Sequence, residues 1–433
     1  MRRTRLLPIV ALAAFALALG ACGGDDDGGT AEGDGTVTVF SLWGGSEQEA
    51  FQKVLDQFTE NTGIETKYES VRDLLPAIRT RLASGNPPEV GIIPRPGVVA
   101  ELARDDSLIS VEDLGLDPDT INENYSDTWT SLATVDDTLY GVVAKANSKS
   151  TIWYKPNSFQ QNGFEIPTTW DQLLDITEQY NSKGEKPWAV GAQGHDNSWT
   201  LTDWFENIYA RTAGGRNYTK LFNGDLPFND QTVKDALTEM TKIINNKYVA
   251  GGIDTALAIG FVGGIRRVFS KNPVAEMYME GSFVGGIALG DVNPDLKVGE
   301  DIDFFPWPTI DPANGNPLVG GADVAAAFVN DEDVAKLVEY LSTPEAGAIW
   351  VSTGAIASPN EGVTSVDYPN ELVAKESEQL KSAKSFLFDG SGLLPGTLGQ
   401  DFGTLLQAVI KNPNQTDSLL DDYQVEAEQA FGG

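Results

Sequence analysis

Residues 36–58, TVTVFSLWGGSEQEAFQKVLDQF, place a β-branched run, a glycine-containing loop and an amphipathic segment in direct succession. The run at 36–40 predicts a buried strand, because Val, Thr and Phe favour extended backbone. Ser46 and Glu49 have the spacing of a capping box, and apolar residues then recur at helical period as far as Phe58. The stretch therefore predicts a strand, a loop and a helix.

The same alternation continues downstream. Further strands are predicted at 64–68 and 90–93, with a helical pattern over 71–82 between them. Strands that alternate with helices are typical of an α/β fold built on a parallel sheet. Ligands of such sheets bind beyond the carboxyl ends of the strands, which directs attention to the loop around Trp43 and to the Pro-Arg-Pro-Gly turn that contains Arg95.

The middle of the chain contains one clear helix signal and two stretches rich in glycine and proline. Thr169 and Gln172 have capping-box spacing and predict a helix that runs to about Tyr180. The stretches 251–265 and 281–322 predict loops around short strands.

The first residues carry a targeting pattern. Basic residues precede an apolar run at 6–19, which is shorter than the roughly 20 residues of a membrane-spanning helix. Small residues then precede Cys22, an order that resembles a bacterial lipoprotein signal; the alternative is an ordinary signal peptide with a chance cysteine. We expect a signal peptide at 1–21, a lipidated Cys22 and a flexible acidic linker over 22–35, and hence an extracytoplasmic protein anchored to the cell membrane.

Composition restricts the classes of function. The formal net charge is -33 at pH 7, and loss of a leader with three arginines changes it from -33 to -36, which excludes nucleic acid as a partner. The single cysteine and single histidine make His/Cys metal sites and Ser-His or Cys-His catalysis very hard to build. About 410 mature residues predict at least two domains.

A series of short motifs follows in order along some 350 residues. They are NPPEV at 86–90, YGV at 140–142, IWYK at 152–155, PTTWDQLL at 167–174, EGSF at 280–283, GGAD at 320–323 and FDG at 388–390. Together they resemble the family 1 extracellular solute-binding proteins of carbohydrate ABC importers, and most of all the α-glucoside-binding branch with its maltose- and trehalose-binding relatives.

That resemblance implies a two-lobed α/β fold of the type II periplasmic-binding-protein kind, with a hinge and an interlobe cleft. It places lobe one at 36–146 plus 312–358 and lobe two at 147–311 plus 359–433. The implied function is capture of a sugar, expected to be an α-glucoside di- or oligosaccharide, and its delivery to the membrane subunits of an ABC permease. The protein is then a monomer with no catalytic residue, cofactor or metal.

Sugar recognition requires aromatic rings that stack on the C–H faces of pyranoses and polar groups that bond their hydroxyls. The residues expected to bind ligand are Trp43, Glu47, Arg95, Trp199, Asp203, Glu280, Phe283, Asp323 and Asp389. Trp199 and Asp203 belong to the segment WTLTDW at 199–204, which resembles the family's Trp-x-x-Thr-Asp-Trp pattern. His195, just before it, is expected to be a loop residue rather than a ligand.

Several of these positions also have a structural interpretation. Trp43 is compatible with the core, Glu47 with a residue that offsets the helix dipole, and Arg95 with a surface arginine. Arg95 also departs from the aromatic, acidic or amide residue that many relatives carry there. Phe283 is compatible with a core position, and Asp323 with a cap or turn.

Two other classes of function stay open at this point. A secreted glycoside hydrolase needs two carboxylates about 5 to 10 Å apart, and the abundance of acidic residues makes chance pairs uninformative. A binder of a non-sugar solute, such as a polyamine or an amino acid, would suit the acidity. The tryptophan-rich candidates favour carbohydrate.

Overall fold

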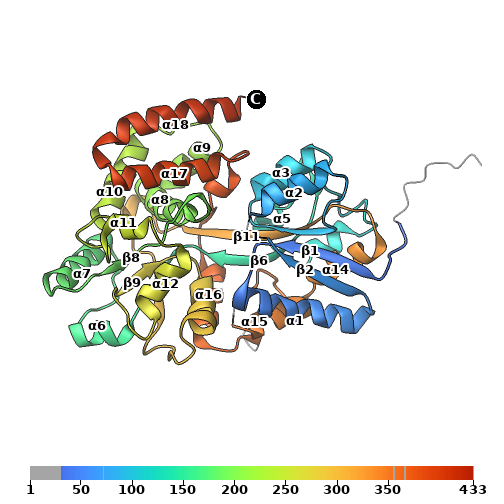
Figure 1. Cartoon of the computed structure of the whole chain (residues 1–433), viewed down its shortest axis with the longest axis horizontal. Coiled ribbons are helices and arrows are strands. Elements are labelled where there is room, and N and C mark those ends of the chain that lie inside the picture. Colours follow the sequence, from blue (N-terminus) through green and yellow to red (C-terminus); the bar gives the residue numbers. More distant parts are fainter. Residues whose placement is uncertain (1–30, 72, 355, 365–366, 433) are drawn as a thin grey trace, which may run out of the picture.

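The computed structural model describes residues 31–71, 73–354, 356–364 and 367–432. The expected signal peptide and Cys22 lie outside the described residues. Figure 1 shows two lobes side by side, with the strands β6 (Val142–Ser148) and β11 (Leu318–Ala327) extending between them. Among the described helices, none combines the length and the apolar character that a membrane crossing requires.

The first lobe is built on a mixed sheet. Within the described residues this sheet has six strands in the order β12-β11-β3-β1-β2, with β6 paired to β11. The remaining strands are β1 (Thr36–Ser41), β2 (Glu65–Ser70), β3 (Val90–Ile93) and β12 (Phe386–Phe388). β1 pairs in parallel with both β2 and β3, which confirms the predicted parallel unit, whereas β11 runs antiparallel to β3 and β6.

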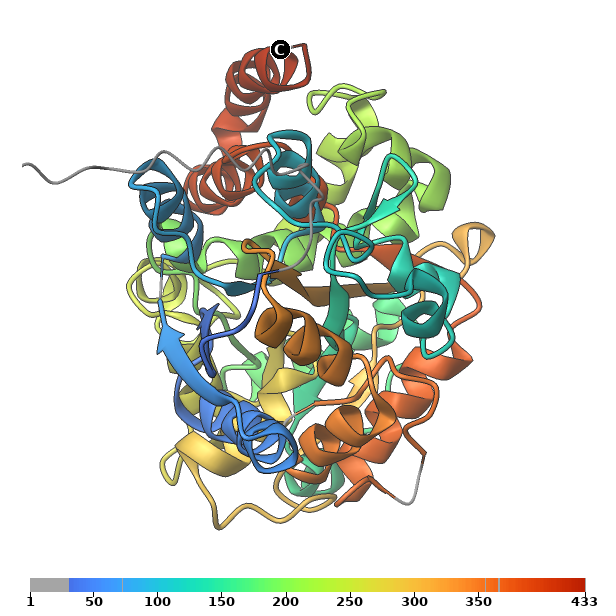
Figure 2. The same ribbon diagram turned by 90° about the vertical axis from the view of Figure 1, so that its right-hand side faces the viewer.

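Helices cover both faces of this sheet. They are α1 (Gly45–Thr62), α2 (Leu74–Ala83), α3 (Pro96–Arg104), α4 (Pro118–Asn122), α5 (Asp127–Thr130), α14 (Glu332–Leu341) and α15 (Pro344–Ser352), with a hairpin of β4 (Thr134–Val135) and β5 (Thr138–Leu139). Figure 1 shows α2 and α3 on one face, and Figure 2 shows α1 beside α14 and α15 on the end of the molecule. Val37, Val39 and Phe51 are fully buried between sheet and helices, and each such side chain contributes about 1.5 to 3 kcal/mol.

The second lobe contains a smaller sheet in the order β10-β7-β9-β8. Its strands are β7 (Thr151–Tyr154), β8 (Trp188–Ala189), β9 (Met277–Met279) and β10 (Asp303–Pro306). Successive side chains of a strand point to opposite faces, so Ile152 and Tyr154 pack into one apolar cluster and Trp153 into another. The sheet is therefore buried on both sides.

Helices again supply the cover. The helices of the second lobe are α6 (Pro156–Asn162), α7 (Trp170–Ser182), α8 (Trp199–Thr212), α9 (Gly214–Phe222), α10 (Gln231–Ile243), α11 (Gly252–Ala256), α12 (Phe261–Phe269), α13 (Phe283–Ile287), α16 (Glu371–Ser382), α17 (Leu398–Lys411) and α18 (Thr416–Phe431). Short helical turns lie at η1 (His195–Asn197), η2 (Ala288–Val292), η3 (Pro312–Asn314), η5 (Ser391–Leu393) and η6 (Pro413–Gln415).

Sequence patterns predicted the structure correctly where the interacting residues are close together in the chain. The capping box of α7 is present, with the Thr169 hydroxyl accepting from the Gln172 backbone and the Gln172 side chain accepting from the Thr169 backbone. The prediction of a loop over 251–265 was wrong, because α11 and α12 occupy it. Gly264 lets α12 lie close to Tyr278, where an added Cβ would stand 2.4 Å from the Tyr278 ring.

The predicted capping box of α1 was also wrong. The helix begins at Gly45, and its N-cap residue is Gly44, which supplies no side-chain acceptor. The Ser46 hydroxyl instead donates to Asp291 of η2, in the second lobe.

The two lobes have separate apolar cores, and the paired strands β6 and β11 join them. Ala146 and Ala322 pack into the first core, whereas Val319, at the start of β11, packs into the second. Phe388 of β12 returns to the first core. The expected lobe boundaries in residue number stay a prediction.

Candidate ligand-binding site

Two buried lysines lie where β6 leaves the first lobe. Lys145 is within β6 and Lys149 follows its last residue, and their exposed fractions are 4% and 8%. A buried ammonium group requires carboxylate partners, because the loss of water otherwise disfavours the charged form. Each lysine has gathered a different set of partners.

Lys149 is held by two buried carboxylates. Its ammonium nitrogen donates to Asp203 Oδ1 of α8 at 2.9 Å and also to Asp389 Oδ2 in the turn after β12. Burial alone would lower the pKa of Lys149, but the charges of Asp203 and Asp389 raise it well above its usual value. The same ammonium, with bonds from Ser391, outweighs burial and lowers the pKa of Asp389.

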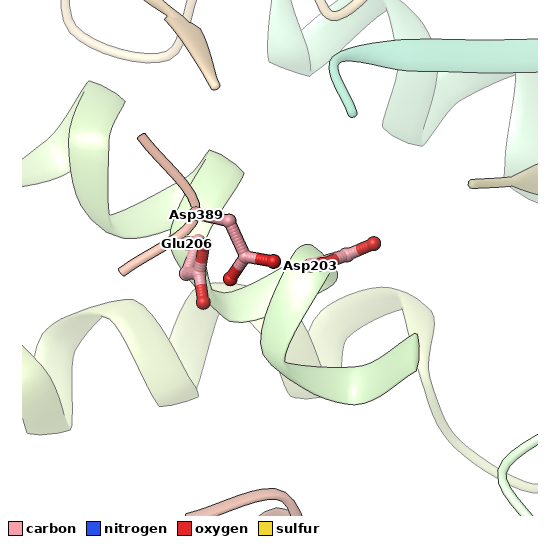
Figure 3. A group of neighbouring side chains, drawn as sticks. All are labelled: Asp203, Glu206 and Asp389. Atoms are coloured by element: carbon pink, nitrogen blue, oxygen red, sulfur yellow. The ribbon is translucent and has the colours of Figure 1, made fainter. Parts of the chain in front are cut away.

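A third carboxylate, Glu206, lies beside this pair. Asp203 and Glu206 project from α8 one turn apart, and Asp389 approaches them from another segment (Figure 3). Such a trio resembles a metal site, but the Lys149 ammonium already bridges the two aspartates. Glu206 accepts from the Gly390 and Ser391 backbone at 2.9 and 3.0 Å. The donor set therefore fits a lysine-centred network rather than a metal ion.

The second oxygen of Asp203 faces Glu280, which follows β9. Both side chains are fully buried, and among the described residues neither Asp203 Oδ2 nor the Glu280 oxygens accept a bond from a donor. Burial raises the pKa of Asp203 to about 6, and burial with the neighbouring Asp203 charge raises that of Glu280 well above its usual range. The two carboxyl groups therefore bind protons more tightly than free side chains do, and a carboxyl that holds its proton can donate a hydrogen bond.

Lys145 connects residues of the first lobe. Its ammonium donates to Glu47 Oε1 of α1 at 2.5 Å, and Asp323 is its partner across the β6–β11 ladder. Burial raises the pKa of Asp323 to about 6, against the opposing effects of the Lys145 charge and a bond from the Trp43 side chain. The same ammonium lies 5.2 Å from the centre of the Trp43 ring and 5.6 Å from that of Phe283.

Aromatic rings line the space between the two lysines. The Trp199 ring lies 5.4 Å from Lys149 Nζ, and its centre is 5.8 Å from that of Phe283 and 5.4 Å from that of Phe261. Trp199 is only partly buried. Trp43, by contrast, is 2% exposed. It packs edge-on against Trp350, with ring centres 4.9 Å apart, so its core interpretation has structural support.

Arg95 lies at the far edge of the same region. It is the N-cap residue of α3, separated from β3 by Pro94, and it is partly buried. Burial lowers the pKa of Arg95, and the charge of Asp389 partly offsets this. Gly97 brings α3 against η5, where an added Cβ would stand 2.7 Å from the Leu393 carbonyl oxygen.

The nine residues selected from the sequence thus lie in one connected group at the junction of the lobes. Lys145, Lys149 and Glu206 were missed. The two lysines had a signal, since each interrupts the otherwise neutral stretch VVAKANSKS at 142–150. His195 lies outside the group, with its Nε2 3.6 Å from Asp401. Contact of any of these residues with a ligand stays a prediction.

Comparison with known proteins gives the chain a family. The family described as bacterial extracellular solute-binding protein matches residues 44–348. The osmoprotective compounds-binding protein GgtB of Synechocystis sp. is 33% identical over 365 residues, which are 84% of this chain and 85% of that protein. The alpha-glucosides-binding periplasmic protein AglE of Rhizobium meliloti is 32% identical over 376 residues, 84% of this chain and 81% of that protein.

Solved structures agree in fold. The bacterial solute receptor AcbH, described as preferring β-D-galactopyranose, superposes with a TM-score of 0.81 at 19% identity, over 92% of this chain and 100% of that one. The periplasmic-binding-protein fold is thereby confirmed.

The chain belongs to the bacterial extracellular solute-binding proteins. The resemblance to the family 1 binding proteins of carbohydrate ABC importers is confirmed by the family match and by both relatives. The protein is accordingly an extracytoplasmic binding protein and not an enzyme, which removes the glycoside hydrolase alternative.

Proposed function

We propose that this protein captures an α-glucoside di- or oligosaccharide between its lobes and delivers it to an ABC permease. The observation that carries the proposal is the group of aromatic and acidic side chains where the two lobes meet. Trp199 and Phe283, which pack edge-on against each other, supply aromatic rings of the kind that bind the C–H faces of a pyranose. Asp203 and Glu280 offer buried oxygen atoms for its hydroxyls.

The linkage class rests on a relative. AglE is named for α-glucosides and shares 32% identity with this chain. GgtB, at 33% identity, is named for osmoprotective compounds, so a compound of that class is the second candidate. The hydroxyl-bonding groups and the aromatic rings at the junction favour the sugar.

A thermal-shift screen separates these classes. Maltose and trehalose represent α-linked glucosides, cellobiose the β-linked isomer, glycine betaine a non-sugar osmoprotectant and spermidine a polyamine. A ligand at 100 times its dissociation constant stabilises by about 2.7 kcal/mol, which corresponds to a rise of about 3 °C in Tm for a chain of this length. We expect that rise with maltose or trehalose and none with cellobiose.

The control is Trp199→Ala, which should fold normally and lose the shift. A shift with spermidine or glycine betaine alone would contradict the sugar proposal. A shift with cellobiose equal to that with maltose would contradict only the α-linkage.

Membrane attachment through Cys22 is part of the proposal. Lipidation of this residue would hold the protein beside its permease, since two or more acyl chains anchor stably. Cys22→Ser should release an intact soluble protein, measured by fractionation. A variant that stays with the membranes after a salt wash would contradict lipid anchoring.

A further inference from the structure

The N-terminus of α1 receives its cap from the opposite lobe. Asp291 Oδ1 lies 3.2 Å from the Ser46 backbone nitrogen, and Asp291 Oδ2 accepts from the Ser46 hydroxyl at 2.9 Å. Asp291 belongs to η2, which packs with the second-lobe helices α12 and α13, whereas Ser46 lies in the first turn of α1. A carboxylate at this position satisfies free N–H groups and offsets the positive end of the helix dipole.

The surrounding backbone is shaped to admit this contact. Gly290 lies so close to α1 that an added Cβ would stand 2.8 Å from Ser46 Cβ. Gly45 has a φ of 59°, in the left-handed region that favours glycine, and its added Cβ would stand 3.0 Å from Asp291 Oδ2. Because neither glycine has a Cβ, α1 and η2 can approach closely enough for Asp291 to reach Ser46.

The contact is conditional on closure. Ser46 moves with the first lobe and Asp291 with the second, so rotation of the lobes apart leaves the helix end without its cap. Gly44 supplies no side-chain acceptor of its own. Asp291 is exposed, and its partner Ser46 directly precedes Glu47, which accepts from Lys145.

We propose that Asp291 is a positioning residue that holds the lobes closed by capping α1 across the cleft, without itself contacting ligand. Removal of a cap typically costs about 1 kcal/mol, which corresponds to about a fivefold change in an equilibrium constant. Asp291→Ala should therefore raise the dissociation rate of maltose about fivefold and leave its association rate nearly unchanged. Asp291→Asn keeps a good capping acceptor and should restore most of the wild-type rate.

The experiment measures closure directly. The sequence has a single cysteine, Cys22, so the full chain with Cys22→Ser accepts spin labels at Lys53→Cys on α1 and Lys271→Cys after α12. Without any sugar, we expect longer label distances in Asp291→Ala than in the parent. Gly290→Ala, which retains the carboxylate but adds the obstructing Cβ, should give the same lengthening.

The two readouts fail separately. The rate measurement rests on the proposed function, whereas the distance measurement needs no ligand. If neither maltose nor trehalose binds but the distances lengthen, the role of Asp291 in closure stands and the proposed α-glucoside function fails. Unchanged label distances in both Asp291→Ala and Gly290→Ala would contradict the proposal that Asp291 holds the lobes closed. Label distances in Asp291→Asn as long as those in Asp291→Ala would contradict it as well.

Discussion

Lys145 and Lys149 leave the same stretch of chain, yet their surroundings differ in kind. Lys149 lies between Asp203 of α8, in the second lobe, and Asp389, in the turn after β12. Lys145 pairs with Glu47 of α1, whose side chain is 15% exposed, and lies near the Phe283 ring of the opposite lobe. Lys149 is therefore enclosed between two carboxylates, whereas Lys145 has a carboxylate of the first lobe on one side and an aromatic ring of the second lobe on the other.

The comparison indicates that a buried charge can either stabilise the folded protein or contribute to the contact between the two lobes. An ion pair within one lobe is never separated during opening, so its desolvation is offset once, on folding. A charge that faces the junction is rehydrated whenever the lobes part. The predictions below test this difference, beginning with the largest expected effect.

The largest effect is expected from Lys149→Ala. Loss of this ammonium leaves Asp203 and Asp389 buried without a counter-charge, which should lower the free energy of unfolding by about 3 to 5 kcal/mol in urea denaturation. Lys145→Ala should lower it by less. Lys247→Ala is the control, because its pair with Glu178 is exposed and should contribute little to stability. Equal losses of unfolding free energy for Lys149→Ala and Lys247→Ala would contradict the expected difference between the buried and the exposed lysine.

The tryptophans beside the two lysines should separate stability from binding. Trp43→Ala should destabilise the protein by about 3 to 5 kcal/mol, since the ring is buried against Trp350. Trp199→Ala should change stability little and weaken sugar binding by roughly 1 to 3 kcal/mol in calorimetry. His195→Ala should change neither. Unaltered affinity in Trp199→Ala would remove that residue from the site.

The pH dependence follows from the raised pKa of Asp203 and Asp323, each about 6 in the folded state against 3.8 for a free side chain. Because the folded protein binds these protons more tightly than the unfolded chain, stability is greatest below about pH 4 for this contribution and falls as pH rises to about 6. We expect a loss of at most about 3 kcal/mol for each of the two groups across that window, since one pKa unit corresponds to about 1.4 kcal/mol. Asp323→Asn should flatten the slope, and a slope as steep as wild type would contradict the assignment.

The smallest expected effect is on size. If the lobes close around sugar, solution scattering should show a smaller radius of gyration with saturating maltose than without it. Asp291→Ala provides the comparison, because a more open unliganded state should show a larger decrease. An unchanged radius in both proteins would mean that the lobes do not move on binding.

The sequence by itself determined the elements that depend on neighbours along the chain, and the family. The parallel unit β1-α1-β2-α2-β3 and the capping box of α7 follow from hydrophobic period and local hydrogen bonds, which act within a few residues. The strand-end rule and the family motifs also selected nine of the residues that meet at the junction, but not Lys145, Lys149 or Glu206. Such patterns involve residues that are close together in the sequence, so one amino-acid sequence is enough to recognise them.

Only the tertiary structure decided which charges meet and which segment caps α1. Lys149 finds Asp389 across 240 positions, and Ser46 finds Asp291 across 245. Residues 251–265 form helices although they are rich in glycine, and one of these glycines, Gly264, packs directly against Tyr278. These contacts form only when folding brings distant segments together. The energy of a buried ion pair, or of a helix cap supplied by another lobe, depends on the surroundings that the folded structure creates.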